Sequence, residues 1–225
     1  MPNTSDQALT PECRWRERQR HLIASLRSQP LLVVLRPSIL DWSETTFERT
    51  PLFALVERLV SAGVQHLEVA WDDHPRWPSL MRALMARHRD LHLGVASVVS
   101  ASALEVVADL GVAFAMSPCL DLQLIVQARE QGQLLVPGVF SPSEIHQAVR
   151  HGCELVKLFP AETLGIDYLS RLSAPMGKLP HVIAAGGLKA ADLESWLAAG
   201  YHALALGRGV INGERVDENL ISWLT

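Results

Sequence analysis

Short apolar runs of β-type composition alternate along this chain with longer segments in which apolar residues recur at three- and four-residue steps. The first pattern predicts buried strands, and the second predicts amphipathic helices. Leu52, Leu55, Val56 and Leu59 show the helical spacing clearly. The predicted strands number eight: Leu31–Leu35, His66–Ala70, Leu91–Ala96, Ala113–Met116, Leu134–Val136, Leu155–Leu158, His181–Ala185 and Ala203–Leu206.

Many of the predicted helices end at a glycine shortly before the next strand, at Gly63, Gly111, Gly132, Gly152 and Gly200. Glycine at this place is typical of helix C-terminal capping, where the backbone takes a positive φ. Eight consecutive strand–helix units with short connections predict an α/β fold, specifically a closed (β/α)8 TIM barrel. An open doubly wound sheet is the main alternative, but no Gly-x-Gly-x-x-Gly motif follows the first strand.

The whole chain, residues 1–225, is predicted to form a single TIM-barrel domain, because no linker-like segment divides it. We expect residues 1–10 to be flexible. Residues 11–27 are expected to form an extra N-terminal helix that lies across the bottom of the barrel.

Composition and charge favour a soluble protein that acts on small molecules. Hydrophobic residues make up 48% of the chain and charged residues 20%, which is ordinary for a globular protein. A net charge of −4 gives no electrostatic basis for binding nucleic acid or an anionic membrane. The widely spaced Cys13, Cys119 and Cys153 argue against a disulfide framework or a thiolate metal cluster. Without a signal-peptide or transmembrane pattern, we expect a cytoplasmic location.

Lys157 stands in an unusual place for a charged side chain. It is one of three lysines in a chain with 17 arginines, and it lies inside an apolar predicted strand. Burial disfavours the ammonium form, so that more of the free amine is available as a carbonyl nucleophile. The structural alternative is a lysine whose stem packs in the core while its head reaches a carboxylate or water.

Glu68 is placed like Lys157, between apolar neighbours and near the end of a predicted strand. Side chains alternate along a strand, so Leu67 and Val69 can face the helices while Glu68 points into the barrel. The same alternation turns Lys157 inward. Taken alone, Glu68 is equally well explained as a structural ion-pair partner. Together the two side chains supply an amine nucleophile and a proton-transfer group, which Schiff-base chemistry requires.

Glycine-rich turns follow the last two predicted strands, at a position that commonly binds phosphate in βα barrels. Arg208 can add a charge-assisted hydrogen bond to an anion there. The alternative is that these glycines only make tight turns. The expected phosphate-binding residues are Gly186, Gly187, Gly207, Arg208 and Gly209. Residues at other strand ends narrow the mouth of the barrel, and we expect substrate contacts from Arg36, Ser97, Pro118 and Phe159.

The chain resembles the class I 2-keto-3-deoxy-6-phosphogluconate (KDPG) and 4-hydroxy-2-oxoglutarate (KHG) aldolase family. The most specific motif is Val156-Lys-Leu-Phe-Pro-Ala-Glu162. The resemblance also runs, in order, through Val34-Leu-Arg36, Leu67-Glu-Val69, Ser117-Pro118, Val136-Pro-Gly138 and Ala185-Gly-Gly187. It implies a βα barrel, a homotrimer, no metal or organic cofactor, an imine-forming Lys157 and an acid/base Glu68.

The reaction implied by the resemblance is reversible cleavage of a 4-hydroxy-2-oxo acid to pyruvate or glyoxylate-type products plus an aldehyde. Lys157 would form an imine with the C2 ketone, and Glu68 would take the proton of the C4 hydroxyl. The implied partners are small 2-oxo acids and aldehydes.

Several positions depart from the family's usual pattern. Where many members have Leu-Glu-Val-Thr-Leu-Arg-Thr, this chain has Leu67-Glu-Val-Ala-Trp-Asp-Asp73. The arginine that commonly binds the pyruvyl carboxylate is therefore replaced by Asp72, which cannot do so. Arg36 is the best replacement, because a guanidinium binds a carboxylate through two hydrogen bonds. A threonine often found before the double glycine is Ala185 here.

Two other functions remain as alternatives. A metal-dependent pyruvate aldolase would use Glu68, Asp72, Asp73 and His74 to hold Mg²⁺ or Mn²⁺, but Lys157 would then have no task. A barrel that has lost catalysis would only bind a phosphorylated or dicarboxylate metabolite, and the missing arginine at Asp72 motivates this alternative.

Overall fold

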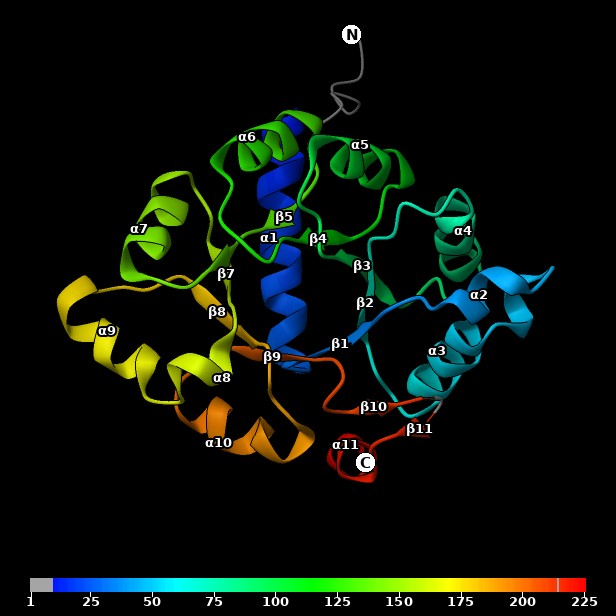
Figure 1. Ribbon diagram of the computed structural model, residues 1–225. Coiled ribbons are helices and arrows are strands. Elements are labelled where there is room, and N and C mark those ends of the chain that lie inside the picture. The colour runs from blue at the N-terminus through cyan, green and yellow to red at the C-terminus, as the bar shows by residue number, and fades with distance from the viewer. Residues whose placement is uncertain (1–9, 214) are drawn as a thin grey trace, which may run out of the picture.

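The computed structural model describes residues 10–213 and 215–225, in which nine parallel strands form one sheet wrapped into a barrel (Figure 1). The strand order is β5-β4-β3-β2-β1-β9-β8-β7-β6. Helices surround the barrel, so the predicted (β/α)8 fold is confirmed. The strands are β1 (Leu31–Leu35), β2 (His66–Ala70), β3 (His92–Ala96), β4 (Phe114–Met116), β5 (Leu135–Val136), β6 (Gly138–Val139), β7 (Leu155–Leu158), β8 (His181–Ala185) and β9 (Ala203–Leu206).

The fifth predicted strand is the one place where the sheet differs from expectation. It continues beyond Pro137 as β6, so Gly138 belongs to the sheet and not to a loop. Proline has no N–H and interrupts the ladder between β5 and β6. Its carbonyl still takes part, because Pro137 O accepts a hydrogen bond from Lys157 N at 2.9 Å. The two short strands therefore occupy one strand position and close the barrel against β7.

The connecting helices begin and end largely as their sequence signals predict. Gly111 and Gly132 are left-handed C-caps of α5 and α6, and Gly63, Gly152 and Gly200 also have positive φ. The helices are α1 (Pro11–Ser28), α2 (Ile39–Ser43), α3 (Pro51–Ser61), α4 (Trp77–Arg87), α5 (Ala101–Leu110), α6 (Leu122–Gln131), α7 (Pro142–Arg150), α8 (Ala161–Leu164), α9 (Tyr168–Met176), α10 (Leu193–Ala198) and α11 (Glu218–Leu224). Short 3₁₀ helices are η1 (Phe47–Arg49) and η2 (Ala190–Asp192), and β10 (Ile211–Asn212) pairs with β11 (Arg215–Val216) as a small antiparallel ribbon.

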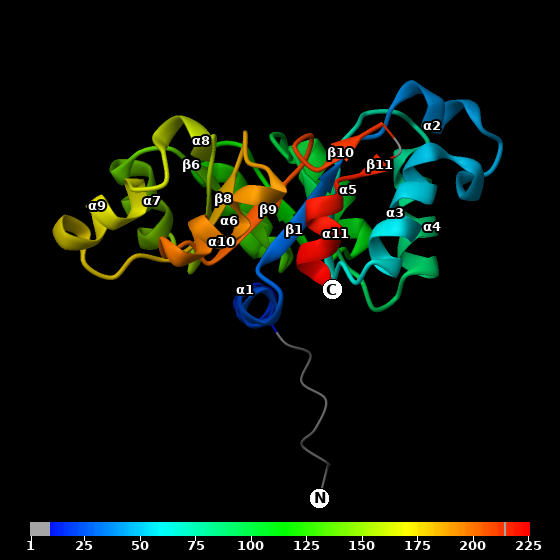
Figure 2. The same ribbon diagram turned by 90° about the horizontal axis from the view of Figure 1, so that it is seen from below.

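The N-terminal helix α1 lies across the bottom of the barrel, as expected (Figure 2). Its Leu22, Ile23 and Leu26 are buried in one cluster with inward-facing strand residues such as Leu32 and Ile183. The opposite end of the barrel carries α2, α8 and β10. Thr10 caps α1 by accepting a hydrogen bond from Cys13 N at 3.2 Å. The flexibility expected of residues 1–10 otherwise concerns residues outside the described part of the chain.

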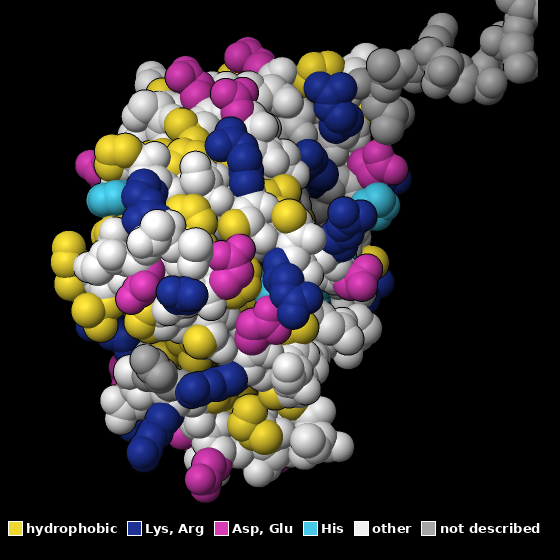
Figure 3. Space-filling view, turned by 90° about the vertical axis from the view of Figure 1, so that its right-hand side faces the viewer, with side chains coloured by type: hydrophobic (Ala, Val, Ile, Leu, Met, Phe, Trp, Pro, Cys, Tyr) yellow, Lys and Arg dark blue, Asp and Glu magenta, His cyan; other side chains and the backbone are white. Residues whose placement is uncertain are grey.

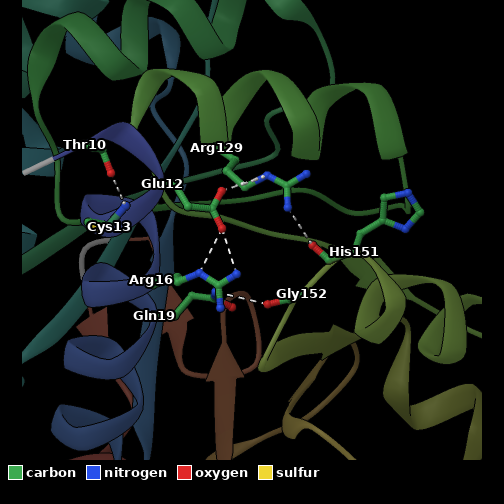
Figure 4. A network of polar contacts seen from close by, with 8 residues as sticks. All are labelled: Thr10, Glu12, Cys13, Arg16, Gln19, Arg129, His151 and Gly152. Carbon is green, nitrogen blue, oxygen red and sulfur yellow. Dashed lines mark hydrogen bonds and ion pairs between the residues drawn. The ribbon is translucent and has the colours of Figure 1, made fainter.

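A polar network fastens α1 to the side of the barrel from which β7 starts (Figure 4). Glu12 forms ion pairs with Arg16 at 2.8 Å on α1 and with Arg129 at 3.4 Å on α6. Arg129 also donates to the carbonyl of His151, 3.5 Å away, at the end of α7. The exposed ion pairs contribute little individually, but they join three helices at one place.

Gln19 makes the buried part of this connection. Its amide donates to Gly152 O at 3.3 Å and accepts from Glu154 N at 2.8 Å, which are backbone groups directly before β7. We expect Gln19→Met to lower the free energy of unfolding by about 1–3 kcal/mol, because two partly buried backbone groups lose their partner. Urea unfolding measures the change. The matched control is Arg20→Met at the next, exposed position of α1, and equal stability of the two variants would contradict this role for Gln19.

The outer surface carries mixed charges. Figure 3 views the molecule from the side of α3 and α4, and it shows Lys and Arg side chains interspersed with Asp and Glu. The face seen in Figure 3 therefore offers no surface of a single charge sign to a polyanion.

Within the described residues, we find no helix long and apolar enough to cross a membrane.

Candidate active site

A cavity of about 870 Å³ opens at the carboxyl ends of the barrel strands. Strand ends and the loops that follow them provide its lining, which is where βα barrels carry their working groups. The cavity brings together every site residue predicted from the sequence: Arg36, Glu68, Ser97, Pro118, Lys157, Phe159, Gly186, Gly187, Gly207, Arg208 and Gly209.

Lys157 lies in β7 and is only 7% exposed. It is in register with Gly138 on one side and with Ile183 on the other. Its Nζ lies 5.4 Å from the centre of the Phe159 ring. Burial lowers the pKa of Lys157 below its ordinary value, and this effect outweighs the opposing attraction of Glu68. The buried amine therefore gives up its proton more readily than a surface lysine.

Glu68 lies in β2, where it is 1% exposed. Its register partners are Val34 on β1 and Gly94 on β3. Burial raises the pKa of Glu68 to about 7, although Lys157 and Arg36 act in the opposite direction. Its Oε1 is buried and has no hydrogen-bond partner among the described residues. A buried, unpaired carboxyl oxygen in a cavity is available to a substrate or to a bound water.

Burial thus lowers the pKa of Lys157 and raises the pKa of Glu68, and both shifts favour the uncharged form of the side chain. Their mutual attraction favours the charged pair, but in both cases burial is the larger effect. In the cavity that they share, the free amine of Lys157 and the protonated acid of Glu68 are therefore each favoured more than they would be at the surface. The free amine is the form that attacks a ketone.

Arg36 and Ser97 lie together at the rim of the cavity. Arg36 Nη1 donates to Ser97 Oγ at 3.3 Å, which links the ends of β1 and β3. Ser97 has φ 65, in the left-handed region that non-glycine residues seldom adopt. Such backbone strain often accompanies a functional position. Arg36 is exposed, so its guanidinium has further donors for a carboxylate.

The glycine turns after β8 and β9 are closely packed. Gly186 and Gly187 have φ of 94 and 86. A Cβ at Gly186 would come within 2.9 Å of the Phe159 ring, and one at Gly187 would collide with the Glu162 side chain. A Cβ at Gly209 would collide with the carbonyl of Leu188. Tight packing alone is therefore enough to require these glycines, and their binding of an anion remains a proposal.

The Asp72-Asp73-His74 segment, considered above as part of a metal site, makes contacts within itself and with Trp42. Asp72 Oδ1 accepts a hydrogen bond from His74 N at 2.8 Å. The His74 ring stacks on Trp42 with centroids 4.4 Å apart. Within residues 10–213 and 215–225, we find no group of three or more His, Cys, Asp or Glu side chains that could hold a metal ion. The segment instead contacts the loop that follows β1.

Sequence reasoning missed that loop as part of the site. Ser38, Leu40 and Asp41 line the cavity, as does Ile211 of the β10–β11 ribbon. A signal was present, because Ser38 and Asp41 form a capping box at the start of α2. The spacing of these two residues predicts an ordered helix start there. It does not indicate that this helix borders the cavity.

The family model described as KDPG and KHG aldolase matches residues 44–222 of this chain. The matched segment covers most of the sequence. The chain belongs to the KDPG and KHG aldolase family. An aldolase is a lyase, so this membership places the chain among the carbon–carbon lyases.

Relatives of this KDPG/KHG aldolase family member agree in reaction type and differ in substrate. The chain is 25% identical to 2-dehydro-3-deoxy-6-phosphogalactonate aldolase of Escherichia coli over 79% of its own length and 82% of the relative. It is 28% identical to the KHG/KDPG aldolase of Escherichia coli over 64% and 67% of the two chains. The relatives differ in substrate, so the substrate of this chain is left open.

The fold also matches a solved structure closely. A KDPG aldolase from Legionella pneumophila, with pyruvate captured at low pH as a covalent carbinolamine intermediate, aligns over 96% of both chains. The TM-score is 0.73 and the sequence identity is 22%. At this identity the match establishes the fold of the barrel.

Proposed function

We propose that this chain is a Schiff-base aldolase that reversibly cleaves a 4-hydroxy-2-oxo acid to pyruvate and an aldehyde. The observation that carries the proposal is the buried amine of Lys157 in a cavity that it shares with the buried carboxyl of Glu68. Family membership supports the same reaction type. No step in this chemistry needs a metal ion or an organic cofactor.

The first half of the reaction forms the imine. The free amine of Lys157 attacks the C2 ketone, and a proton passes from nitrogen to oxygen to give the carbinolamine. Glu68 then donates its proton to the departing hydroxyl, which leaves as water. The products of this step are a protonated imine on Lys157 and the carboxylate of Glu68. The new positive charge stabilises that carboxylate and lowers the pKa of Glu68.

The second half breaks the carbon–carbon bond. The Glu68 carboxylate takes the C4 hydroxyl proton, directly or through a water, while the electrons of the C3–C4 bond move into the protonated imine. The aldehyde leaves, and an enamine remains on Lys157. Glu68 returns the proton to C3, and hydrolysis of the imine releases pyruvate and regenerates the amine and the protonated acid.

Binding groups for the two ends of the substrate are proposed at the strand ends around this centre. Arg36 is proposed to hold the carboxylate of the 2-oxo acid, because it takes over from the family arginine that Asp72 replaces. The turns Gly186–Gly187 and Gly207–Gly209, with Arg208, are proposed to hold an anionic group of the aldehyde half. A panel of KDPG, its galactonate isomer and 4-hydroxy-2-oxoglutarate would rank substrates by kcat/KM.

Borohydride trapping tests the proposed chemistry. We expect incubation with pyruvate and borohydride to add a reduced pyruvyl group to Lys157, because hydride converts the imine to a stable amine. Digestion and mass mapping locate the adduct. The exposed Lys178 and Lys189 in the same chain serve as internal controls. A chain that carries no adduct on Lys157, or carries it equally on the control lysines, would show that this barrel does not use an imine.

A further inference from the structure

The segment between β1 and α3, residues 36–50, forms one wall of the cavity mouth. It contains α2 and η1 and lies at the end of the barrel away from α1 (Figure 2). Leu40 on α2 is 60% exposed, although it lines the cavity. Leu52, Leu55 and Ile211 line the cavity as well. An apolar surface therefore faces the mouth, where a substrate can cover it.

Asp41 holds α2 in place beside the cavity. This buried carboxylate accepts from Ser38 N at 2.7 Å and from Ser38 Oγ at 2.9 Å. It also accepts from Leu52 N at 2.8 Å, which joins α2 to the start of α3. Hydrogen bonds to a buried charged group are the strong kind, so the position of neighbouring Leu40 is well determined.

Arg76 fixes the same wall from the other side. Its guanidinium donates to the carbonyls of Trp42 at 2.9 Å, Glu44 at 2.8 Å and Thr45 at 3.3 Å. It also lies 4.7 Å from the centre of the Phe47 ring. His74 adds the stacking contact with Trp42. The wall is thus formed before any ligand arrives, and a preformed apolar surface binds apolar groups without an ordering cost.

The wall adjoins the side of the cavity proposed for the aldehyde half of the substrate. β1 pairs directly with β9, so the loop that follows β1 lies next to the turn Gly207–Gly209. Gly207 is within van der Waals range of β1, since a Cβ there would lie 3.6 Å from Val34 O. Leu40 also precedes the residues 44–222 that match the family model.

We propose that Leu40, Leu52, Leu55 and Ile211 form a subsite for an apolar carbon chain on the aldehyde half of the substrate, with Leu40 as the specificity-determining residue. This inference rests on the proposed aldolase function. In the direction of synthesis, C3 of the pyruvate enamine on Lys157 bonds to the aldehyde carbon, and Glu68 protonates the aldehyde oxygen. The rest of the aldehyde then packs on the apolar wall, where displacement of water favours binding.

Aldol addition of pyruvate to hexanal and to acetaldehyde tests this subsite, because the two uncharged aldehydes differ in apolar length alone. We expect the wild-type chain to have the higher kcat/KM with hexanal. Leu40→Ser should lower the ratio of hexanal to acetaldehyde kcat/KM by about tenfold, since lost apolar contact in a pocket costs selectivity of this order. Ile39→Ser is the matched control, because Ile39 is the neighbouring residue, is 76% exposed and is absent from the cavity lining.

The outcomes separate the subsite from the aldolase chemistry. An unchanged ratio in Leu40→Ser, an equal fall in Ile39→Ser, or no wild-type preference for hexanal would overturn the subsite even when pyruvate is trapped on Lys157. If pyruvate is not trapped on Lys157, the subsite is tested by measuring the binding of hexanoate by calorimetry. Hexanoate is a suitable probe because it forms no imine. Binding of hexanoate that weakens about tenfold in Leu40→Ser and not in Ile39→Ser supports the subsite, and equal binding by all three proteins refutes it.

Discussion

Lys157→Arg is expected to lower kcat for aldol cleavage by about 10⁴-fold or more, because the variant keeps a cation in the cavity but has no free amine. Arginine stays protonated at every working pH, so it cannot attack the C2 ketone. In the wild-type chain, by contrast, burial lowers the pKa of Lys157 and so favours its free amine. The measurement is the initial rate of pyruvate release, followed with a coupled dehydrogenase, and borohydride trapping should fail in parallel.

Two controls make the result specific to the amine. Lys178→Arg carries the same substitution at an exposed lysine and should keep the wild-type rate. Assays with EDTA present should give the wild-type rate too, which separates imine chemistry from a metal-dependent aldolase. Substantial cleavage by Lys157→Arg, or a rate that depends on a removable metal, would contradict the assigned role of Lys157.

The barrel itself could be predicted from local patterns. Parallel strands covered on both faces are short continuous apolar runs, and here they are separated by helices that end at glycine. Five of the eight strands, for example Leu31–Leu35 and Leu155–Leu158, have the predicted bounds. The continuation of the fifth strand past Pro137 could not be predicted, because proline usually ends a strand. Only the neighbouring β7, whose Lys157 N bonds to Pro137 O, shows why the chain stays extended there.

The reacting centre was also accessible from sequence. Strand alternation turns Glu68 and Lys157 inward, and a barrel brings distant strands to one cavity. The wall formed by Leu40 was not accessible in this way, since an exposed leucine in a polar loop carries no periodic signal. The acidic pair Asp72-Asp73 was similarly ambiguous. In the structure Asp72 accepts a hydrogen bond from His74 N, and the His74 ring stacks on Trp42, which lies 32 residues earlier in the chain.

Glu68→Gln is the second substitution with a large expected effect. It keeps the size of the side chain but removes the titratable carboxyl, so kcat for cleavage should fall by about 10²–10⁴-fold. The free amine of Lys157 remains, so long incubation with pyruvate and borohydride should still label it. Wild-type kcat/KM should decrease as pH rises through the pKa of Glu68, about 7, because the free enzyme then lacks the acid that removes water from the carbinolamine. This decrease of kcat/KM with rising pH, the alkaline limb of the profile, should be absent in Glu68→Gln.

Stability should change with pH in a related way. The pKa of Glu68 rises from 4.5 to about 7 on folding, so the folded state binds this proton more tightly than the unfolded state does. The stabilising contribution of the protonated carboxyl is therefore complete below about pH 4.5 and is lost as pH rises through about 7. Glu68→Gln has no such proton, so its advantage in urea unfolding over the wild-type chain should grow across this window. A variant that keeps the wild-type limb in kcat/KM and the wild-type stability profile would show that another group titrates, and that Glu68 does not supply the proton.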